Sequence, residues 1–205
     1  MPLGDSITDG YQSTDGNGYR KHLYDSLAAD GHVTNFVGSR RAGNMADPEN
    51  EGWSGYRINE VSAKATASVP SRKPNVYTVD IGTNDVNQSY QVDGMKGRVD
   101  AAIENLWKMT PKATIVLSTL TQHGKSNFDQ TVQKVNAQYR ELVKEKQAQN
   151  KRIVLAEMHD SANAPKHPAD FADDLHPNDQ GYAKMANIWL GAIRAADAQG
   201  LIQAP

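Results

Sequence analysis

The run Val76-Tyr77-Thr78-Val79-Asp80-Ile81 is followed at once by Gly82-Thr83-Asn84-Asp85. Its first six residues are mostly apolar, aromatic or β-branched, which is typical of a strand buried on both faces of a sheet. The glycine then ends the run and opens a polar loop. A strand buried on both faces needs helices on either side of the sheet. This stretch therefore favours an α/β sandwich.

The rest of the chain repeats the same alternation. Three further runs are predicted as strands: Val33–Gly38, Thr114–Thr119 and Ile153–Glu157. Apolar residues spaced by threes and fours predict helices over Tyr19–Ala29, Asp93–Met109, Asn127–Gln149 and a segment after Pro177. Only Met1 to Leu3 are available for a first central strand ahead of Ser6. We predict one domain over residues 1–205, a three-layer α/β/α sandwich with a parallel sheet of about five strands.

Composition excludes several classes of function. The chain has 22 basic and 24 acidic residues, a net charge of -2 and no cysteine. This balance offers no electrostatic reason to bind nucleic acid or an anionic membrane. No apolar run approaches the ~20 residues that a membrane span needs. The chain opens on Met1-Pro2-Leu3-Gly4 without a charged and apolar leader, so a signal peptide is expected either never to have existed or to have been removed.

Ligands of open α/β sheets bind beyond the carboxyl ends of the strands. That rule selects four loops: Gly4–Gly18, Ser39–Tyr56, Gly82–Gln91 and Met158–Asn178. The first loop reads Gly4-Asp5-Ser6-Ile7-Thr8-Asp9-Gly10, in which Ser6 is either an activated nucleophile or a helix cap. It is not a Gly-x-Ser-x-Gly elbow, because Ile7 is followed by a threonine.

The third and fourth loops hold further candidates. Asn84 either makes a turn or offers amide donors to an oxyanion. Asp173 stands three residues before His176, where its carboxylate can reach the imidazole Nδ1–H and select the tautomer. The alternative is that Asp173 and Asp174 are surface acids and Asn178 caps the last helix. The capping and the catalytic interpretations are compatible.

Gly-Asp-Ser-Ile, Gly-Thr-Asn-Asp and Asp-x-x-His-Pro, in this order, resemble blocks one, three and five of the SGNH, or GDSL-like, hydrolases. Trp53-Ser54-Gly55-Tyr56 resembles block two. The resemblance spans nearly the whole chain and implies the flavodoxin-like SGNH fold. It also implies Ser6 as nucleophile, His176 as base and Asp173 as its partner. The oxyanion hole would comprise the Ser6 and Gly55 main-chain N–H groups and the Asn84 amide.

A narrower resemblance rests on Val37-Gly38-Ser39 and on the stretch from Glu51 to Ile58, which are similar to carbohydrate esterase family 3 acetylxylan esterases. It implies a secreted, monomeric serine esterase that removes acetyl groups from acetylated xylan or oligosaccharides without metal or organic cofactor. Tyr11, Trp53 and Tyr56 would offer aromatic faces to sugar rings, although Trp53 could equally pack under its own loop.

Three other functions remain open. One is a general short-chain esterase or lysophospholipase-like enzyme of the same family. Another is a non-catalytic carbohydrate-binding domain, which the presence of all four block residues disfavours. A zinc deacetylase is disfavoured because the other histidines lack ligand spacing. A structural calcium in Asp47–Glu51 is conceivable, but such acidic loops are usually solvated surface.

Overall fold

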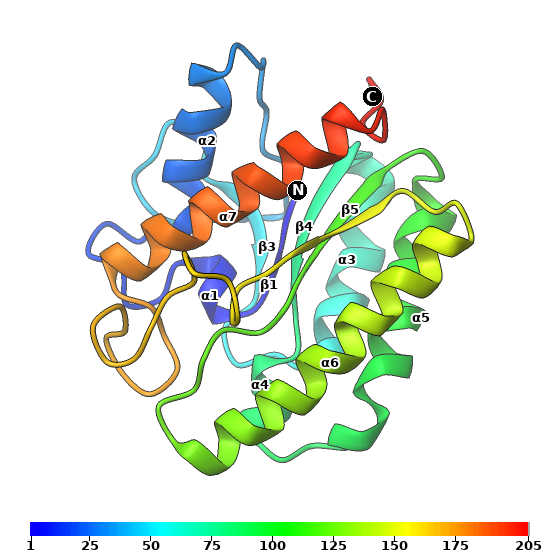
Figure 1. Ribbon diagram of the computed structural model, residues 1–205. Helices are drawn as coiled ribbons and strands as arrows, with labels where there is room; N and C mark the ends of the chain where they lie inside the picture. The colour runs from blue at the N-terminus through cyan, green and yellow to red at the C-terminus, as the bar shows by residue number, and fades with distance from the viewer. Residues whose placement is uncertain (205) are drawn as a thin grey trace.

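A computed structural model describes residues 1–204 and shows one sheet of six strands between two layers of helices (Figure 1). The strands run in the order β2-β3-β1-β4-β5-β6. Their bounds are Pro2–Gly4 (β1), Arg40–Arg41 (β2), Glu49–Gly52 (β3), Val76–Asp80 (β4), Thr114–Ser118 (β5) and Ile153–Ala156 (β6). All neighbouring strands pair in parallel except β2, which pairs antiparallel with β3 at one edge.

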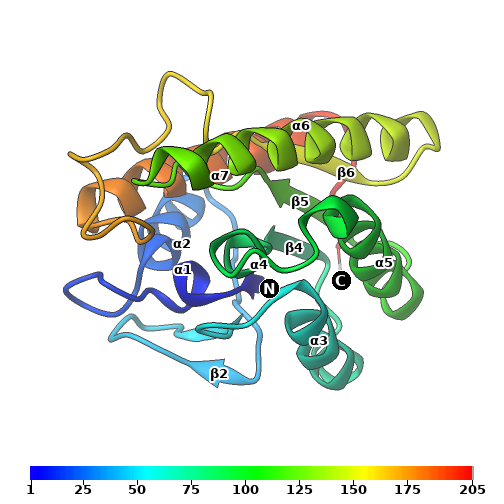
Figure 2. The same ribbon diagram turned by 90° about the horizontal axis from the view of Figure 1, so that it is seen from below.

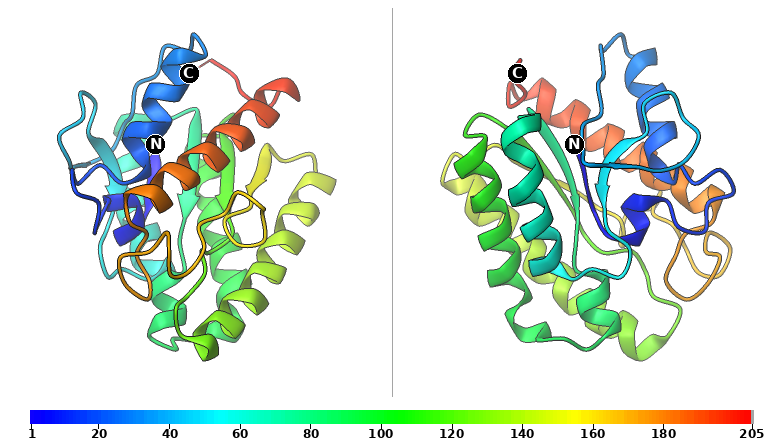
Figure 3. Two further views of the ribbon diagram at one scale, coloured as in Figure 1. Left: turned by 60° about the vertical axis from the view of Figure 1, so that its left-hand side comes forward. Right: turned by 180° about the vertical axis from the view of Figure 1, so that it is seen from behind.

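Five longer helices cover the sheet. One face carries α3 (Ile58–Arg72), α5 (Met95–Met109) and α6 (Ser126–Ala148), and the other carries α2 (Tyr19–Ala29) and α7 (Asp179–Ala198) (Figure 3). Two short helices, α1 (Ser6–Asp9) and α4 (Thr83–Asn87), lie at the carboxyl ends of the strands (Figure 2), and a 3₁₀ turn, Val92–Gly94, precedes α5. The predicted three-layer fold is confirmed.

Each helical layer closes its own apolar core. Leu3, Val79 and Leu117 point to the α3, α5 and α6 side, whereas Val116 and Val154 point to the α2 and α7 side. The alternation follows from the two-residue period of a strand. Of the helices described within residues 1–204, none is both long and apolar enough to cross a membrane.

The predicted strand Val33–Gly38 is wrong. These residues form no strand, and Val33 is fully exposed. Its place beside β1 is taken by β3, whose sequence Glu49-Asn50-Glu51-Gly52 has no apolar residue. The hairpin of β2 and β3 raises the strand count from about five to six.

The polar strand β3 is buried because its side chains find partners. Asn50 donates to the Pro48 carbonyl and accepts from the Gly52 N–H at 2.8 Å. Glu51 is fully buried and accepts from the Ser39 N–H and the Trp53 indole. Part of Asp47–Glu51 is therefore buried, in contrast to the expected solvated surface. Buried polar groups are tolerated when they are hydrogen-bonded.

Helix α3 is absent from the sequence-based prediction. Its buried face consists of Ile58, Val61, Ala65, Ser68 and Val69, of which two are small, and Pro70 lies inside its last turns. Small residues weaken the periodic signal, and an internal proline usually predicts the end of a helix.

Candidate active site

Three side chains from the two ends of the chain meet at the carboxyl edge of the sheet. Ser6 begins α1, with only Asp5 between it and β1, and its Oγ lies 2.9 Å from the Nε2 atom of His176, which is 170 residues away. The Nδ1 atom of His176 lies 2.9 Å from Asp173 Oδ2 and 3.1 Å from Oδ1. The structure thus brings the predicted nucleophile, base and acid together in a continuous chain of hydrogen bonds.

The loop before α7 forms this acid–histidine pair locally. The Ala172 N–H donates to the His176 carbonyl at 2.9 Å, which closes a tight turn. Within the turn Asp173 Oδ1 accepts the main-chain N–H groups of Leu175 and His176, both at 2.7 Å. Partial burial would raise the pKa of Asp173, but the bonds from the His176 N–H and ring outweigh it and hold the pKa below its usual value. Asp173 is therefore an anion beside the imidazole.

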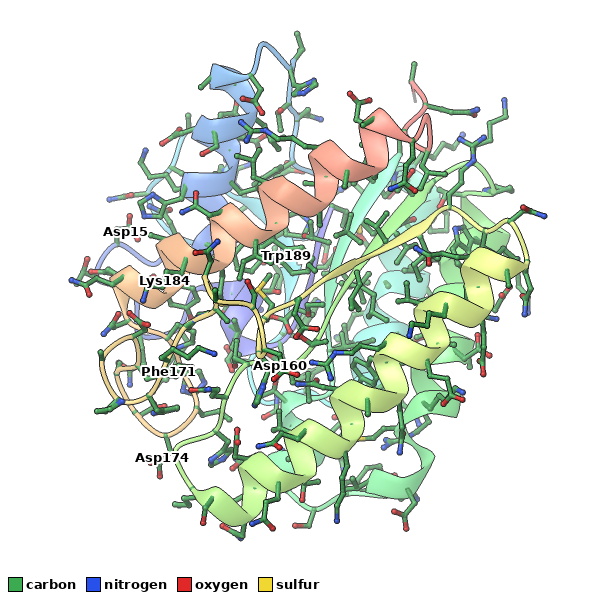
Figure 4. The ribbon with its side chains drawn as sticks, viewed as in Figure 1. Asp15, Asp160, Phe171, Asp174, Lys184 and Trp189 are labelled. Carbon is green, nitrogen blue, oxygen red and sulfur yellow. The ribbon has the colours of Figure 1, made fainter. Side chains whose placement is uncertain are left out.

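Asp174, the neighbouring acid, has a different environment. Its side chain is about half exposed and lies 3.4 Å from Lys125 Nζ. Figure 4 shows it at the outer edge of the molecule. Asn178 caps α7 by accepting the Gly181 N–H at 3.0 Å, as expected from the sequence. Of the two adjacent acids, only Asp173 faces His176.

Asn84 lies on α4 and is almost completely buried. Its Nδ2 donates to the Tyr56 carbonyl at 3.0 Å, which leaves the second N–H of the amide for another acceptor. The next residue, Asp85, accepts the Ile58 N–H at 3.0 Å and the guanidinium of Arg98. The bonds to Tyr56 and Ile58 tie α4 to the segment that carries Gly55.

Gly55 belongs to an exposed turn between β3 and α3. Its φ of +82° is a left-handed conformation that favours glycine, whereas a Cβ there would meet nothing within 4 Å. Backbone conformation, not a close approach within the protein, therefore requires this glycine. The hydroxyl of the preceding Ser54 donates to Asp9 Oδ2 at 3.0 Å, and the main-chain N–H of Trp53 donates to the Gly4 carbonyl at 3.0 Å. The three segments predicted to form the oxyanion hole thus meet beside Ser6.

The three predicted aromatic residues have different surroundings. Tyr11 is 52% exposed, and its ring meets the His176 ring edge-on with 4.7 Å between centroids. The Trp53 ring packs against Tyr56 at a tilt of 33°, with 5.5 Å between centroids, and Lys64 Nζ lies 4.3 Å from the centre of the Trp53 ring. The indole also lies 4.8 Å from the Arg40 guanidinium. Trp53 therefore lies between Tyr56, the α3 residue Lys64 and the β2 residue Arg40, and Tyr11 is the exposed ring beside the triad.

Two buried acids lie beneath Ser6. Asp5 caps α1 by accepting the Ile7 N–H at 3.0 Å, and Asp80 accepts the Ser118 hydroxyl at 3.1 Å. Burial raises the pKa of Asp80 to about 7, and burial together with Asp80 raises the pKa of Asp5. Asp80 falls within the predicted buried strand Val76–Ile81, whereas nothing in the sequence distinguishes Asp5 from a surface carboxylate.

Within residues 1–204, no three His, Cys, Asp or Glu side chains are placed to hold a metal ion. A cavity of about 200 Å³ lies among Leu23, Leu27, Phe36 and Ile193, at the end of the sheet opposite Ser6. Its lining is mixed apolar and polar and contains none of the predicted site residues. The chemistry therefore belongs to the carboxyl edge of the sheet.

A serine, an imidazole and a carboxylate in sequence, on a three-layer α/β/α sheet, form the arrangement that serine hydrolases use. The model of the GDSL-like lipase/acylhydrolase family matches residues 3–184, so the chain belongs to this family. Membership makes it a carboxylic ester hydrolase, and the resemblance to SGNH hydrolases is confirmed.

The chain is similar to a multidomain esterase and to two family 3 carbohydrate esterases of known structure. A multidomain esterase of Ruminococcus flavefaciens is 29% identical over 96% of this chain, which spans 29% of that protein. A family 3 carbohydrate esterase of Clostridium thermocellum is 25% identical, with a TM-score of 0.84 over 97% of this chain and 96% of that chain. A family 3 carbohydrate esterase from Talaromyces cellulolyticus is 22% identical, with a TM-score of 0.81 over 97% of each chain, and shows the same fold.

Proposed function

We propose that this protein is a serine esterase that removes acetyl groups from acetylated xylan or a related carbohydrate. The observation that carries the proposal is the bond of 2.9 Å between Ser6 Oγ and His176 Nε2, with Asp173 on the other ring nitrogen. In this arrangement the imidazole can accept the hydroxyl proton while Ser6 attacks the ester carbonyl.

The tetrahedral intermediate would place its oxyanion between the Ser6 and Gly55 N–H groups and the Asn84 amide. One such donor supports roughly 3–4 kcal/mol of the barrier reduction. His176 then gives the proton to the departing sugar hydroxyl, and an acetyl group remains on Ser6. Water that the same histidine deprotonates attacks this ester, acetate leaves, and the proton returns to Ser6.

An alcohol as large as a polysaccharide requires an open site. Asp173 is 39% exposed and Tyr11 is 52% exposed, so both sides of His176 border solvent. An apolar trough for a long acyl chain is absent from the residues described around the triad. The similarity to the Clostridium thermocellum carbohydrate esterase supports the same substrate class. A polymeric substrate would place the enzyme outside the cell, and we expect it to act there as a monomer.

The test compares two substrate series at one enzyme concentration. Acetate release from acetylated xylan is followed beside hydrolysis of nitrophenyl esters with acyl chains from two to ten carbons, with Ser6→Ala as the blank. The proposal expects acetate release from the polymer and a steep fall in ester hydrolysis beyond short chains. Fast hydrolysis of long chains with an inert polymer would instead indicate the general esterase. Polymer binding without any hydrolysis would indicate the carbohydrate-binding domain.

A further inference from the structure

Arg20, in the first turn of α2, is fully buried. Within residues 1–204 its acceptors are all main-chain carbonyls, apart from the Met45 sulfur at 3.9 Å. Five carbonyls surround the guanidinium: Thr8 at 2.9 Å, Asp9 at 3.2 Å, Gly16 at 2.9 Å, Ala42 at 3.1 Å and Pro48 at 3.3 Å. A guanidinium has five N–H donors, so the site matches the number of donors with the number of carbonyls.

The carbonyls come from segments that lead to the candidate active site. Thr8 and Asp9 end α1, the helix of one turn that begins with Ser6. Ala42 and Pro48 flank the loop between β2 and β3, and β3 leads to Gly55. These segments touch closely, because a Cβ at Gly52 would lie 2.4 Å from the Asp9 nitrogen. Arg20 therefore connects the segment that carries the nucleophile with the segment that carries a predicted oxyanion donor.

Stability alone is a poor reason for this arrangement. Desolvation of a charge is costly, and apolar residues of similar volume often replace buried ionic groups without loss of stability. A rigid planar group with five fixed donors does what an apolar side chain cannot, because it sets the directions of five carbonyls at once. Two of those carbonyls, on Thr8 and Asp9, belong to α1.

We propose that Arg20 is a positioning residue for acyl transfer. Its guanidinium holds α1 against the β2–β3 loop, so that the Ser6 hydroxyl faces His176 and the Ser6 and Gly55 N–H groups face a common point. The proposal rests on the proposed serine mechanism, but Arg20 itself touches neither substrate nor the reacting atoms.

The experiment is removal and chemical rescue. Arg20→Ala leaves a buried site of guanidinium shape that is lined by carbonyl oxygens. We expect kcat for a nitrophenyl acetate to fall roughly a hundredfold, as misplacement of a reacting group by about 1 Å can produce, with little change in KM. Guanidinium chloride at millimolar concentration, far below denaturing levels, should restore much of the rate. Equal sodium chloride or urea should not.

Three controls accompany the variant. Arg194 lies on the surface of α7 and pairs with Asp30 at the end of α2. The kcat of the Arg194→Ala variant should equal that of wild type with or without added guanidinium. Inactivation by a serine-directed phosphonate measures the reactivity of Ser6 without turnover. Hydrogen exchange of the Ile7–Gly10 amides reports the position of α1 without reference to activity, and it should accelerate in Arg20→Ala and slow again with guanidinium.

The outcomes separate the two proposals. An Arg20→Ala enzyme that keeps its rate within threefold of wild type refutes the positioning role. A slow Arg20→Ala variant also refutes it if added guanidinium changes neither its kcat nor its amide hydrogen exchange. If Arg20→Ala does not fold, Arg20→Lys is measured in its place. A wild-type kcat in Arg20→Lys refutes the need for a planar guanidinium, whereas a tenfold loss of kcat supports that need. A wild-type protein that the phosphonate does not label refutes the serine mechanism, while hydrogen exchange still decides the role of Arg20.

Discussion

Replacement of Asp173 by Asn tests the assignment of the triad most directly. The variant side chain retains one oxygen, which can keep the two bonds of 2.7 Å from the Leu175 and His176 N–H groups. The turn should therefore persist. The oxygen that faces Nδ1 at 2.9 Å becomes an amide nitrogen, which can only donate. The amide nitrogen favours the tautomer in which Nδ1 accepts, so the ring proton moves to Nε2 and His176 loses the lone pair that would receive the Ser6 proton.

The size of the effect follows from two opposing terms. Loss of the carboxylate in a buried triad costs about 10⁴ in kcat, or about 5.4 kcal/mol. Asp173 is 39% exposed, so water can replace part of its interaction with the imidazolium. We therefore expect a loss of roughly a thousandfold, or about 4 kcal/mol, with KM almost unchanged.

Asp174→Asn is the matched control. It makes the same chemical change one residue away, at a half-exposed side chain whose ion pair is a surface contact of 3.4 Å with Lys125. Such pairs contribute about 0–1 kcal/mol, so kcat should change less than about fivefold. Both variants are measured for kcat and KM on nitrophenyl acetate at one pH, with circular dichroism as a check on folding. Greater loss in Asp174→Asn would show that the register of the triad is wrong, and two active variants would show that a Ser6–His176 dyad suffices.

Three further predictions concern the same edge of the sheet. Ser6→Ala should reduce kcat by more than a hundredfold and leave the melting temperature near wild type, and a residual rate above about one hundredth would exclude Ser6 as nucleophile. Asn84→Ala should lower kcat about a hundredfold, whereas an effect on KM alone would make Asn84 a contact to the bound ester. Burial raises the pKa of Asp80 to about 7 in the folded state, against 3.8 in the unfolded chain. Between these two pH values the folded state keeps a proton that the unfolded state loses, so the free energy of unfolding falls as the pH rises through this range. Asp80→Asn should remove up to about 4 kcal/mol of that pH dependence in denaturant melts from pH 4 to 8, and an unchanged slope would contradict the shifted pKa.

The sequence predicts best those features that depend on neighbours along the chain. Helix α2 begins and ends at the residues that the apolar spacing indicates. Helices α5 and α6 differ from their predicted bounds by at most two residues at either end, and α7 begins after Pro177 as predicted. The Asp173–His176 pair is local in the same sense, because a turn of four residues brings its two side chains together. Asn178 caps the helix that follows it for the same reason. Interactions between residues three or four apart can therefore be predicted from the spacing of residue types along the sequence.

Contacts between distant segments required the tertiary structure. The strand beside β1 is polar β3 and not Val33–Gly38, and buried Glu51 accepts the N–H of Ser39, which lies twelve residues earlier, a contact that no local pattern reveals. The meeting of Ser6 with His176 across 170 residues was inferred from family motifs, and only the fold supplies the distance. Nothing in the sequence distinguishes Arg20 from a surface cation, whereas the fold encloses its guanidinium with five carbonyls from three segments. Spacing in the sequence reveals apolar burial, whereas burial of a polar group depends on partners that only folding brings within reach.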